Sequence, residues 1–339
     1  MKPSPASPAS LDDGQRPAPP HAAGPSSGGQ SGPAIAMLSR LGRLARGLWR
    51  LATINRKVMV GSGIIAFFAL VALFGPLFIH QNPNKFTTNL MAHPTAAHLL
   101  GTNQGGQDVF SQLVLGTRSS LSWAFLTGLL VVCISVSVGL IGGYFGGAVD
   151  DAFSLITNVF LVIPSLPLAI VAVQYFNRAT ITIALIVALT NWPWGARVLR
   201  AQTLSMRSRE FVTAAKAGGE RSLRIIFFEI FPNELTIVAA SFITTTIQVL
   251  LAVAGLEFLG FGDSTTISWG TMLYGAYNGG ALLIGAWWWF VPPGLCIALL
   301  GSGLALLNFG IDEIADPRLR VGRPARRRWR FGAKKAVQI

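Results

Sequence analysis

Six apolar stretches constrain this sequence more than any other feature. Each is close to the roughly 20 residues that a helix needs to cross the hydrocarbon of a bilayer. They cover about 58–79, 119–143, 152–175, 179–198, 235–256 and 286–308. Only 12% of the residues are charged, about half the share usual for a soluble domain. The sequence therefore predicts an all-α membrane protein with six transmembrane helices.

The positions of the basic residues predict how these spans are oriented. Eight Lys and Arg residues precede the first span, seven lie in 197–234 and nine follow residue 308, whereas the segments on the opposite side hold three. Cytoplasmic loops of membrane proteins collect Lys and Arg. We therefore expect a multi-pass protein of the cell or inner membrane with both termini in the cytoplasm. Topology then explains the net charge of +13 without any binding to nucleic acid.

The two ends of the chain differ in composition from the spans. Residues 1–36 are rich in Pro, Ala, Ser and Gly, which predicts a disordered cytoplasmic tail. In 37–57, Leu and Arg recur at helical spacing, so we expect a basic amphipathic helix at the membrane interface, with a solvated basic stretch as the alternative. Residues 311–339 form a basic cytoplasmic tail, which we expect to contact anionic membrane lipid.

The domain between these ends, 58–310, contains none of the usual sequence signals for nucleotide binding, ion coupling or metal binding. The sequence contains no phosphate-binding G-x-x-x-x-G-K-[S/T] loop. No span has a charged residue at its centre, where ion-coupled carriers place one. Cys133 and Cys296 lie in apolar runs, and the four histidines form no metal-binding pattern. We expect no catalytic, cofactor-binding or metal-binding residues, and a chain that depends on partners for energy.

Two loops of this domain are long, an outer loop at 80–118 and a cytoplasmic loop at 199–233. The cytoplasmic loop carries an apolar face of small residues at i, i+3, i+4 and i+7, formed by Phe211, Ala214, Ala215 and Gly218. Gly218-Gly219 can take positive φ and end this helix, and Pro232 marks the start of the next span. Such a helix fits a groove of another protein or packs on its own bundle, and the pattern leaves both open.

At these positions the sequence resembles the inner-membrane permeases of ABC importers. Their loop signature is Glu-Ala-Ala, three residues, Gly, nine residues, then Ile-x-Leu-Pro. Here Thr213-Ala214-Ala215, Gly219 and Phe231-Pro232 stand in register with it. Thr213 replaces the acidic residue, and Glu210, one turn earlier, is the candidate substitute.

The resemblance narrows to the C-type permease of the dipeptide, oligopeptide and nickel import family. It rests on the outer-loop stretch 100–109 with Gly101, Thr102, Gly106 and Asp108, and also on Pro164-Ser165-Leu166-Pro167, Phe258-Leu259-Gly260, Ser268-Trp269-Gly270 and Asp316-Pro317-Arg318. In the outer loop the family usually has one acidic and two basic residues. This chain has Asn103, Gln107 and Gln112 at those positions.

The resemblance implies a type I ABC importer bundle and a set of partners. A homologous second permease would complete the translocation path, two ATP-binding subunits would bind the ATP, and an extracytoplasmic solute-binding protein would deliver a peptide or related solute. The coupling residues carried over are Glu210, Phe211, Thr213, Ala214, Ala215, Gly218, Gly219 and Pro232. Thr244, Thr245 and Gln248 are candidates for the path, although threonine hydroxyls in helices commonly bond to the backbone. The alternative function is a channel or membrane scaffold without ATP coupling.

Overall fold

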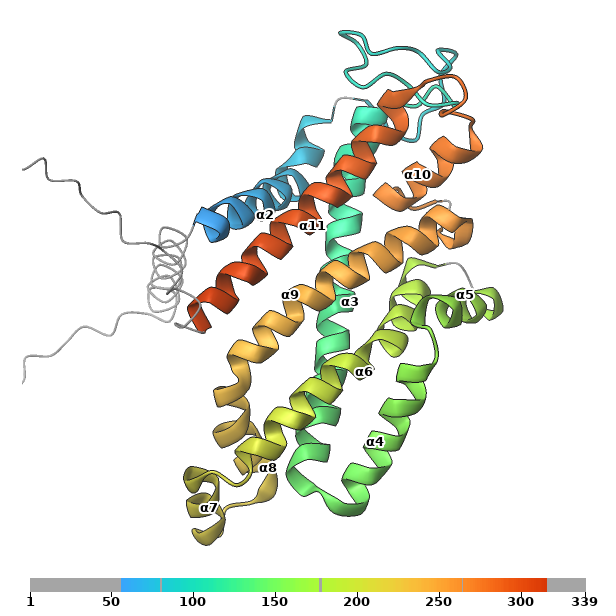
Figure 1. Ribbon diagram of the computed structural model, residues 1–339. Helices are drawn as coiled ribbons and strands as arrows, with labels where there is room; N and C mark the ends of the chain where they lie inside the picture. Colours follow the sequence, from blue (N-terminus) through green and yellow to red (C-terminus); the bar gives the residue numbers. More distant parts are fainter. Residues whose placement is uncertain (1–55, 80, 177–178, 264, 316–339) are drawn as a thin grey trace, which may run out of the picture. The chain divides into compact units, whose positions relative to one another are not determined.

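The computed structural model describes residues 56–79, 81–176, 179–263 and 265–315, and it is helical over most of this length (Figure 1). These ranges contain no β-strand, and one isolated antiparallel bridge joins Thr102 to Asp108. The predicted tail at 1–36, nearly all of the predicted interfacial helix at 37–57 and most of the predicted basic tail at 311–339 lie outside the described residues.

Five helical segments in the described ranges are long and apolar enough to cross a membrane. They are Arg56–Phe78, which contains α2 (Arg56–Phe74); α3 (Val109–Phe145); α6 (Thr180–Met206); Ser222–Phe261, which contains α9 (Phe231–Leu256); and the first part of α11 (Trp287–Ala315). The fold class predicted from the apolar stretches is therefore confirmed, with five continuous spans.

The sixth predicted span, at 152–175, is broken. Its residues belong to α4 (Gly147–Val162) and α5 (Ser165–Tyr175), whose axes differ by 89°. The break falls at Ile163 and Pro164, which both have extended backbone conformations. A proline disfavours the helical conformation of the residue before it. The span predicted at 152–175 is therefore not one continuous helix, and a count of six spans requires this bent pair to cross as one unit.

Several helices extend beyond the predicted spans into the predicted loops. The α3 helix begins at Val109, within the predicted outer loop, and α6 continues to Met206, within the predicted cytoplasmic loop. The helical run that contains α9 begins at Ser222. The connections between the spans are therefore shorter and more rigid than the apolar stretches alone indicate.

The long α3 helix packs along α6 and α9, and α2 packs along α11 (Figure 1). Two glycines let α3 and α6 approach closely. A Cβ atom at Gly139 would lie 2.8 Å from Leu199 Cβ, and one at Gly143 would lie 2.7 Å from Thr203 Cβ. Both distances are shorter than real contacts between such atoms, so these positions require glycine. Arg200 of α6 also pairs with Asp150 of α4, with 2.7 Å between Nη2 and Oδ2.

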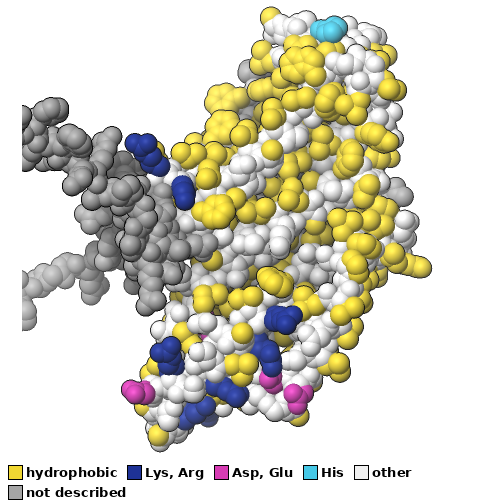
Figure 2. All heavy atoms as spheres, viewed as in Figure 1, with side chains coloured by type: hydrophobic (Ala, Val, Ile, Leu, Met, Phe, Trp, Pro, Cys, Tyr) yellow, Lys and Arg dark blue, Asp and Glu magenta, His cyan; other side chains and the backbone are white. Residues whose placement is uncertain are grey.

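Hydrophobic side chains cover the middle of the molecule, whereas Lys and Arg side chains gather over the end that carries the short helix α7 (Glu210–Ala217) (Figure 2). Large exposed apolar side chains include Phe67, Leu73 and Leu155, each at least 60% exposed. Such a surface suits contact with lipid or with another transmembrane subunit.

The contact between α3 and α6 predicts a sharp size limit at Gly143. We expect Gly143→Ala to lower the free energy of unfolding by about 1–3 kcal/mol, because the added methyl group overpacks the contact with Thr203. Gly63→Ala in α2 is the matched control, since its Cβ atom would meet no atom within 4 Å. Thermal unfolding of both purified variants in detergent compares them. Equal midpoints would contradict this account of the contact.

Candidate functional site

The candidate coupling helix, α7, lies between α6 and α8 (Ser222–Arg224), at one end of the molecule (Figure 1). It ends in a Schellman motif. Gly219 N–H donates to Lys216 O at 3.0 Å, and Glu220 N–H donates to Ala215 O at 3.2 Å. Gly219 has φ of 76°, in the left-handed region, whereas Gly218 has φ of −71°. The predicted positive φ is therefore present, and it belongs to the second glycine of the pair.

A single buried residue fixes α7 to the bundle. Val212 is fully buried in a cluster with Leu140 and Tyr144 of α3 and with Ile225, Ile226 and Ile230 of the π-helical turn Ile225–Ile230. Lys216 adds a contact, with its Nζ atom 4.9 Å from the centroid of the Tyr144 ring. The neighbours of Val212 come from distant parts of the chain, so no local pattern in the sequence marks this residue.

The residues of the predicted small face of α7 do not all point the same way. Ala215 packs partly against the Val212 cluster, whereas Ala214 and Gly218 are exposed and Phe211 is 38% exposed. Glu210 and Thr213 are also exposed, and the Thr213 hydroxyl bonds to Arg209 O at 3.2 Å. We call Glu210, Phe211, Thr213, Ala214 and Gly218 the outward surface of α7. Ala215 is half-buried, because it packs in part against the protein's own core.

Pro232 lies in the first turn of α9, but it does not begin a new helical run. The run starts at Ser222 and passes through the π-helical turn Ile225–Ile230. At the end of this turn, Phe231 N–H bonds to Ile226 O five residues back. This wider ring suits a position next to a proline, which has no N–H to donate. Pro232 therefore stands at the predicted place, in the first turn of α9, although the helical run that contains α9 begins earlier, at Ser222.

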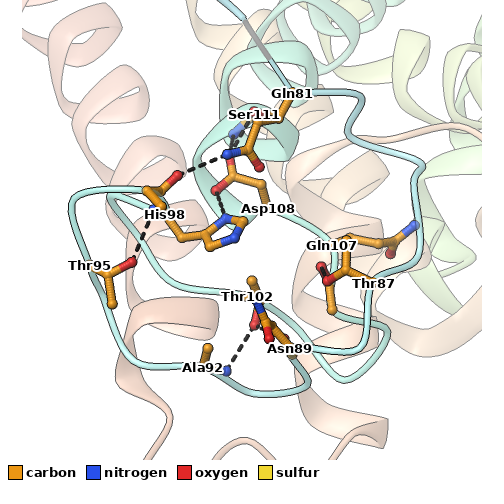
Figure 3. Close-up of polar contacts among 12 residues, drawn as sticks. Gln81, Thr87, Asn89, Ala92, Thr95, His98, Thr102, Gln107, Asp108 and Ser111 are labelled. Carbon is orange, nitrogen blue, oxygen red and sulfur yellow. Dashed lines mark hydrogen bonds and ion pairs between the residues drawn. The ribbon is translucent and has the colours of Figure 1, made fainter.

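The outer-loop residues predicted from the resemblance lie together where α3 begins (Figure 3). Asp108 caps α3, since its Oδ2 accepts hydrogen bonds from Ser111 N at 2.8 Å and Ser111 Oγ at 2.6 Å. Its Oδ1 lies 3.0 Å from His98 Nδ1. Thr102 Oγ1 donates to Asn89 O at 2.6 Å and accepts from Ala92 N at 2.8 Å. Gly101 and Gly106 both have positive φ.

Beside this cap, Asn103, Gln107 and Gln112 form a network of amides. Asn103 Nδ2 donates to Gln107 Oε1 at 2.8 Å, and Gln112 Nε2 donates to the same oxygen at 3.1 Å and to Pro83 O at 3.1 Å. These are the three positions at which the chain lacks the charges usual in the family it resembles. In the structure these three uncharged side chains are joined by hydrogen bonds.

Of the candidate path residues, Gln248 lines a cavity of about 580 Å³ among α4, α5, α6 and α9. Thr190 and Asn191 of α6 line the same cavity, although neither is among the residues predicted for the path. Thr244 is exposed and bonds to Ala240 O at 3.1 Å. Thr245 is half-buried. The alternative of backbone bonding therefore describes Thr244, whereas Gln248 lines a mostly apolar cavity between the helices.

Comparison with known proteins identifies the family of this chain. Residues 135–321 match the model of the family described as "Binding-protein-dependent transport system inner membrane component". The chain is 33% identical to the dipeptide transport system permease protein DppC of Alkalihalophilus pseudofirmus, over 78% of this chain and 87% of that protein. It is 30% identical to the oligopeptide transport system permease protein OppC of Bacillus subtilis, over 83% and 93%.

Two further proteins are more distant. The nickel transport system permease protein NikC of Escherichia coli is 29% identical over 76% of this chain and 92% of that protein. A solved chain of the MetNI methionine ABC transporter in an inward-facing conformation has a TM-score of 0.47 and 21% identity, over 60% of this chain and 94% of that chain. The chain thus belongs to the family of inner membrane components of binding-protein-dependent transport systems.

The left-handed conformation of Gly219 predicts which replacements the end of α7 tolerates. We expect Gly219→Val to destabilise this turn by about 1–3 kcal/mol, because a β-branched residue is strained at positive φ. Gly219→Asn is the matched variant, since Asn accepts this conformation more readily. No atom lies within 4 Å of the added Cβ, so conformation alone is tested. Hydrogen exchange at the amides of Gly219 and Glu220 measures the effect, and equal protection in both variants would contradict it.

The cap of α3 predicts that Asp108 stabilises the outer loop. We expect Asp108→Ala to cost about 0.5–2 kcal/mol of stability, because the Ser111 N–H and hydroxyl lose their acceptor. Asp108→Asn keeps an acceptor oxygen and should retain most of this stability. Limited proteolysis of the outer loop, together with thermal unfolding, distinguishes the variants. Equal resistance of the Ala variant and the unchanged protein would show that the cap contributes nothing.

Proposed function

We propose that this chain is the transmembrane permease subunit of an ATP-driven ABC importer that carries di- or oligopeptides or a related solute. Membership of the family supports the importer class. Relatives named for dipeptide, oligopeptide and nickel transport support the range of solutes. The structural observation that carries the proposal is the outward surface of α7, which is held on the bundle by buried Val212.

The contacts of α7 suit the transmission of movement. Val212 contacts residues of α3 and of the π-helical turn before α9, so a displacement of α7 would move the ends of two spans. Docking of one of the two ATP-binding subunits on the outward surface would link ATP binding to a rigid-body shift of these helices. Such a shift would close the solute path on the outer side of the membrane and open it on the inner side. The protein itself supplies no catalytic residue and no nucleotide site in this scheme.

The distribution of charge supports an orientation in the membrane that places α7 in the cytoplasm, where the ATP-binding subunits would be. Seven Lys and Arg residues lie in 197–224, around α7, which favours the cytoplasm for this end. The outer loop and Asp108 then face the extracytoplasmic side, where a solute-binding protein would dock. A homologous second permease would cover the open side of the cavity that Gln248 lines and complete the path.

The outward surface predicts that side-chain size at Ala214 controls docking. We expect Ala214→Leu to weaken binding of the ATP-binding subunits by about 5- to 150-fold, because overpacking costs about 1–3 kcal/mol. Ala214 tests this contact more directly than Ala215, whose replacement would also disturb the Val212 cluster. Ala239→Leu, at an exposed position of α9, is the matched control.

Co-purification of the co-expressed ATP-binding subunits and solute-stimulated ATPase activity measure the effect. The Ala214 variant should still insert in the membrane, since the exposed side chain contributes nothing to the core. Normal docking and normal stimulation in this variant would show that α7 is an internal connector. That result would favour a channel or membrane scaffold without ATP coupling.

A further inference from the structure

A second cavity, of about 670 Å³, lies at the end of the molecule that carries the outer loop. Its walls come from the outer loop, from the connection between α9 and α10 (Trp269–Asn278), and from α10 and α11. Two carboxylates line it, those of Glu257 and Asp263, together with the aromatic rings of Phe86, Tyr274 and Trp289. Among the described residues, no Lys, Arg or His lines this cavity.

Glu257 is the buried carboxylate of the cavity. Its side chain is 4% exposed, and its Oε2 accepts a hydrogen bond from Ser268 Oγ at 2.6 Å. Within the part of the chain that the structure describes, no Lys, Arg or His forms an ion pair with this carboxylate. Burying a carboxylate without a counter-ion is costly. A positively charged group of a ligand would remove this cost.

Two glycines fix the position of Glu257. A Cβ atom at Gly262 would lie 3.1 Å from Glu257 Cγ, and one at Gly270 would lie 2.6 Å from Glu257 Cβ. Neither residue can be larger without moving the glutamate. The carboxylate is therefore held at the wall of the cavity by the backbone around it.

Asp263 supplies a second negative charge. Its Oδ1 accepts hydrogen bonds from Thr265 Oγ1 at 2.7 Å and Thr265 N at 2.8 Å, and its Oδ2 accepts from Thr266 Oγ1 at 3.2 Å. These hydrogen bonds, with that of the Thr265 hydroxyl first, hold the pKa of the Asp263 carboxyl below its usual value. Asp263 is therefore ionised at neutral pH.

The composition of the walls selects among ligand chemistries. Carboxylate or phosphate groups would meet two acidic side chains and no base. A metal ion requires a cluster of ligands, and the described residues contain no group of three His, Cys, Asp or Glu that could hold one. An ammonium group gains from carboxylates through charge and from aromatic rings through cation–π attraction. The amide oxygens of the outer-loop network add acceptors.

We propose that this outer cavity binds the ammonium group of a transported solute, with Glu257 as its counter-ion. The inference rests on the proposed function in so far as the ligand is cargo. It adds the chemical class of that cargo, a solute with a positively charged amine.

A pair of probes that differ at one group tests this assignment. Alanyl-alanine methyl ester carries an ammonium group, and its N-acetyl derivative does not. The full chain, reconstituted in lipid nanodiscs, should bind the first probe at least about tenfold more tightly in calorimetric titration, since hydrogen bonds to charged groups are the stronger ones. Equal affinities, or no binding of either probe, would overturn the proposal.

Replacement of the carboxylate locates the effect. Glu257→Gln keeps an acceptor for Ser268 and should lose about tenfold in affinity for the ammonium probe, with little change for the acetylated probe. Glu229→Gln, in the π-helical turn near α7, is the matched control and should bind both probes as the unchanged protein does. If Glu257→Gln does not fold, Asp263→Asn provides the same comparison from outside the spans. Unchanged ammonium selectivity in the folded cavity variant would refute the assignment.

The two proposals can fail separately. Equal probe affinities together with an intact effect of Ala214→Leu on ATPase docking would refute the cavity assignment alone. Selective binding of the ammonium probe together with normal docking of the Ala214 variant would refute the importer proposal and leave a binding site without ATP coupling.

Discussion

The close approach of α3 and α6 is the contact on which the rest of the structure depends. It requires glycine at 139 and 143, because any side chain there would overlap Leu199 or Thr203. The same α3 helix is capped by Asp108 at one end and contributes Leu140 and Tyr144 to the Val212 cluster at the other. One continuous helix therefore connects the outer loop with the helix proposed to contact the ATP-binding subunits. A stiff element of this length suits a protein whose two ends must act together.

Much of the fold could be predicted from the sequence, because long apolar stretches report spans directly. Periodicity and the Gly218-Gly219 pair located α7 and its left-handed end. The break at Pro164 was missed, since the apolar stretch continues through it, although a proline within a span was a usable signal. The early start of α3 was also missed, and Asp108, followed three residues later by Ser111, was its signal as a helix cap.

The candidate site was less predictable, because its contacts join distant segments. The burial of Val212 depends on Leu140 and on Ile230, which are far away in sequence. The orientation of Ala215 toward the core follows from that anchor, and periodicity alone could not distinguish the two sides of an eight-residue helix. The cavity that contains Glu257 is built from four separate parts of the chain, so no local pattern indicates it. The spacing of residues along the chain predicts individual helices and turns, whereas a cavity depends on how those helices and loops pack together.

The amide network of the outer loop has a consequence for the conditions in which the protein works. Ion pairs weaken as ionic strength rises, and they change when a partner gains or loses a proton. Asn103, Gln107 and Gln112 neither titrate at ordinary pH nor depend on screening by salt. In the proposed orientation this loop would lie on the extracytoplasmic side, where salinity and acidity are set by the surroundings rather than by the cell. The part of the loop that these neutral amides hold would keep its shape through changes in that medium, whereas the contact between His98 and Asp108 in the same loop joins two ionisable groups.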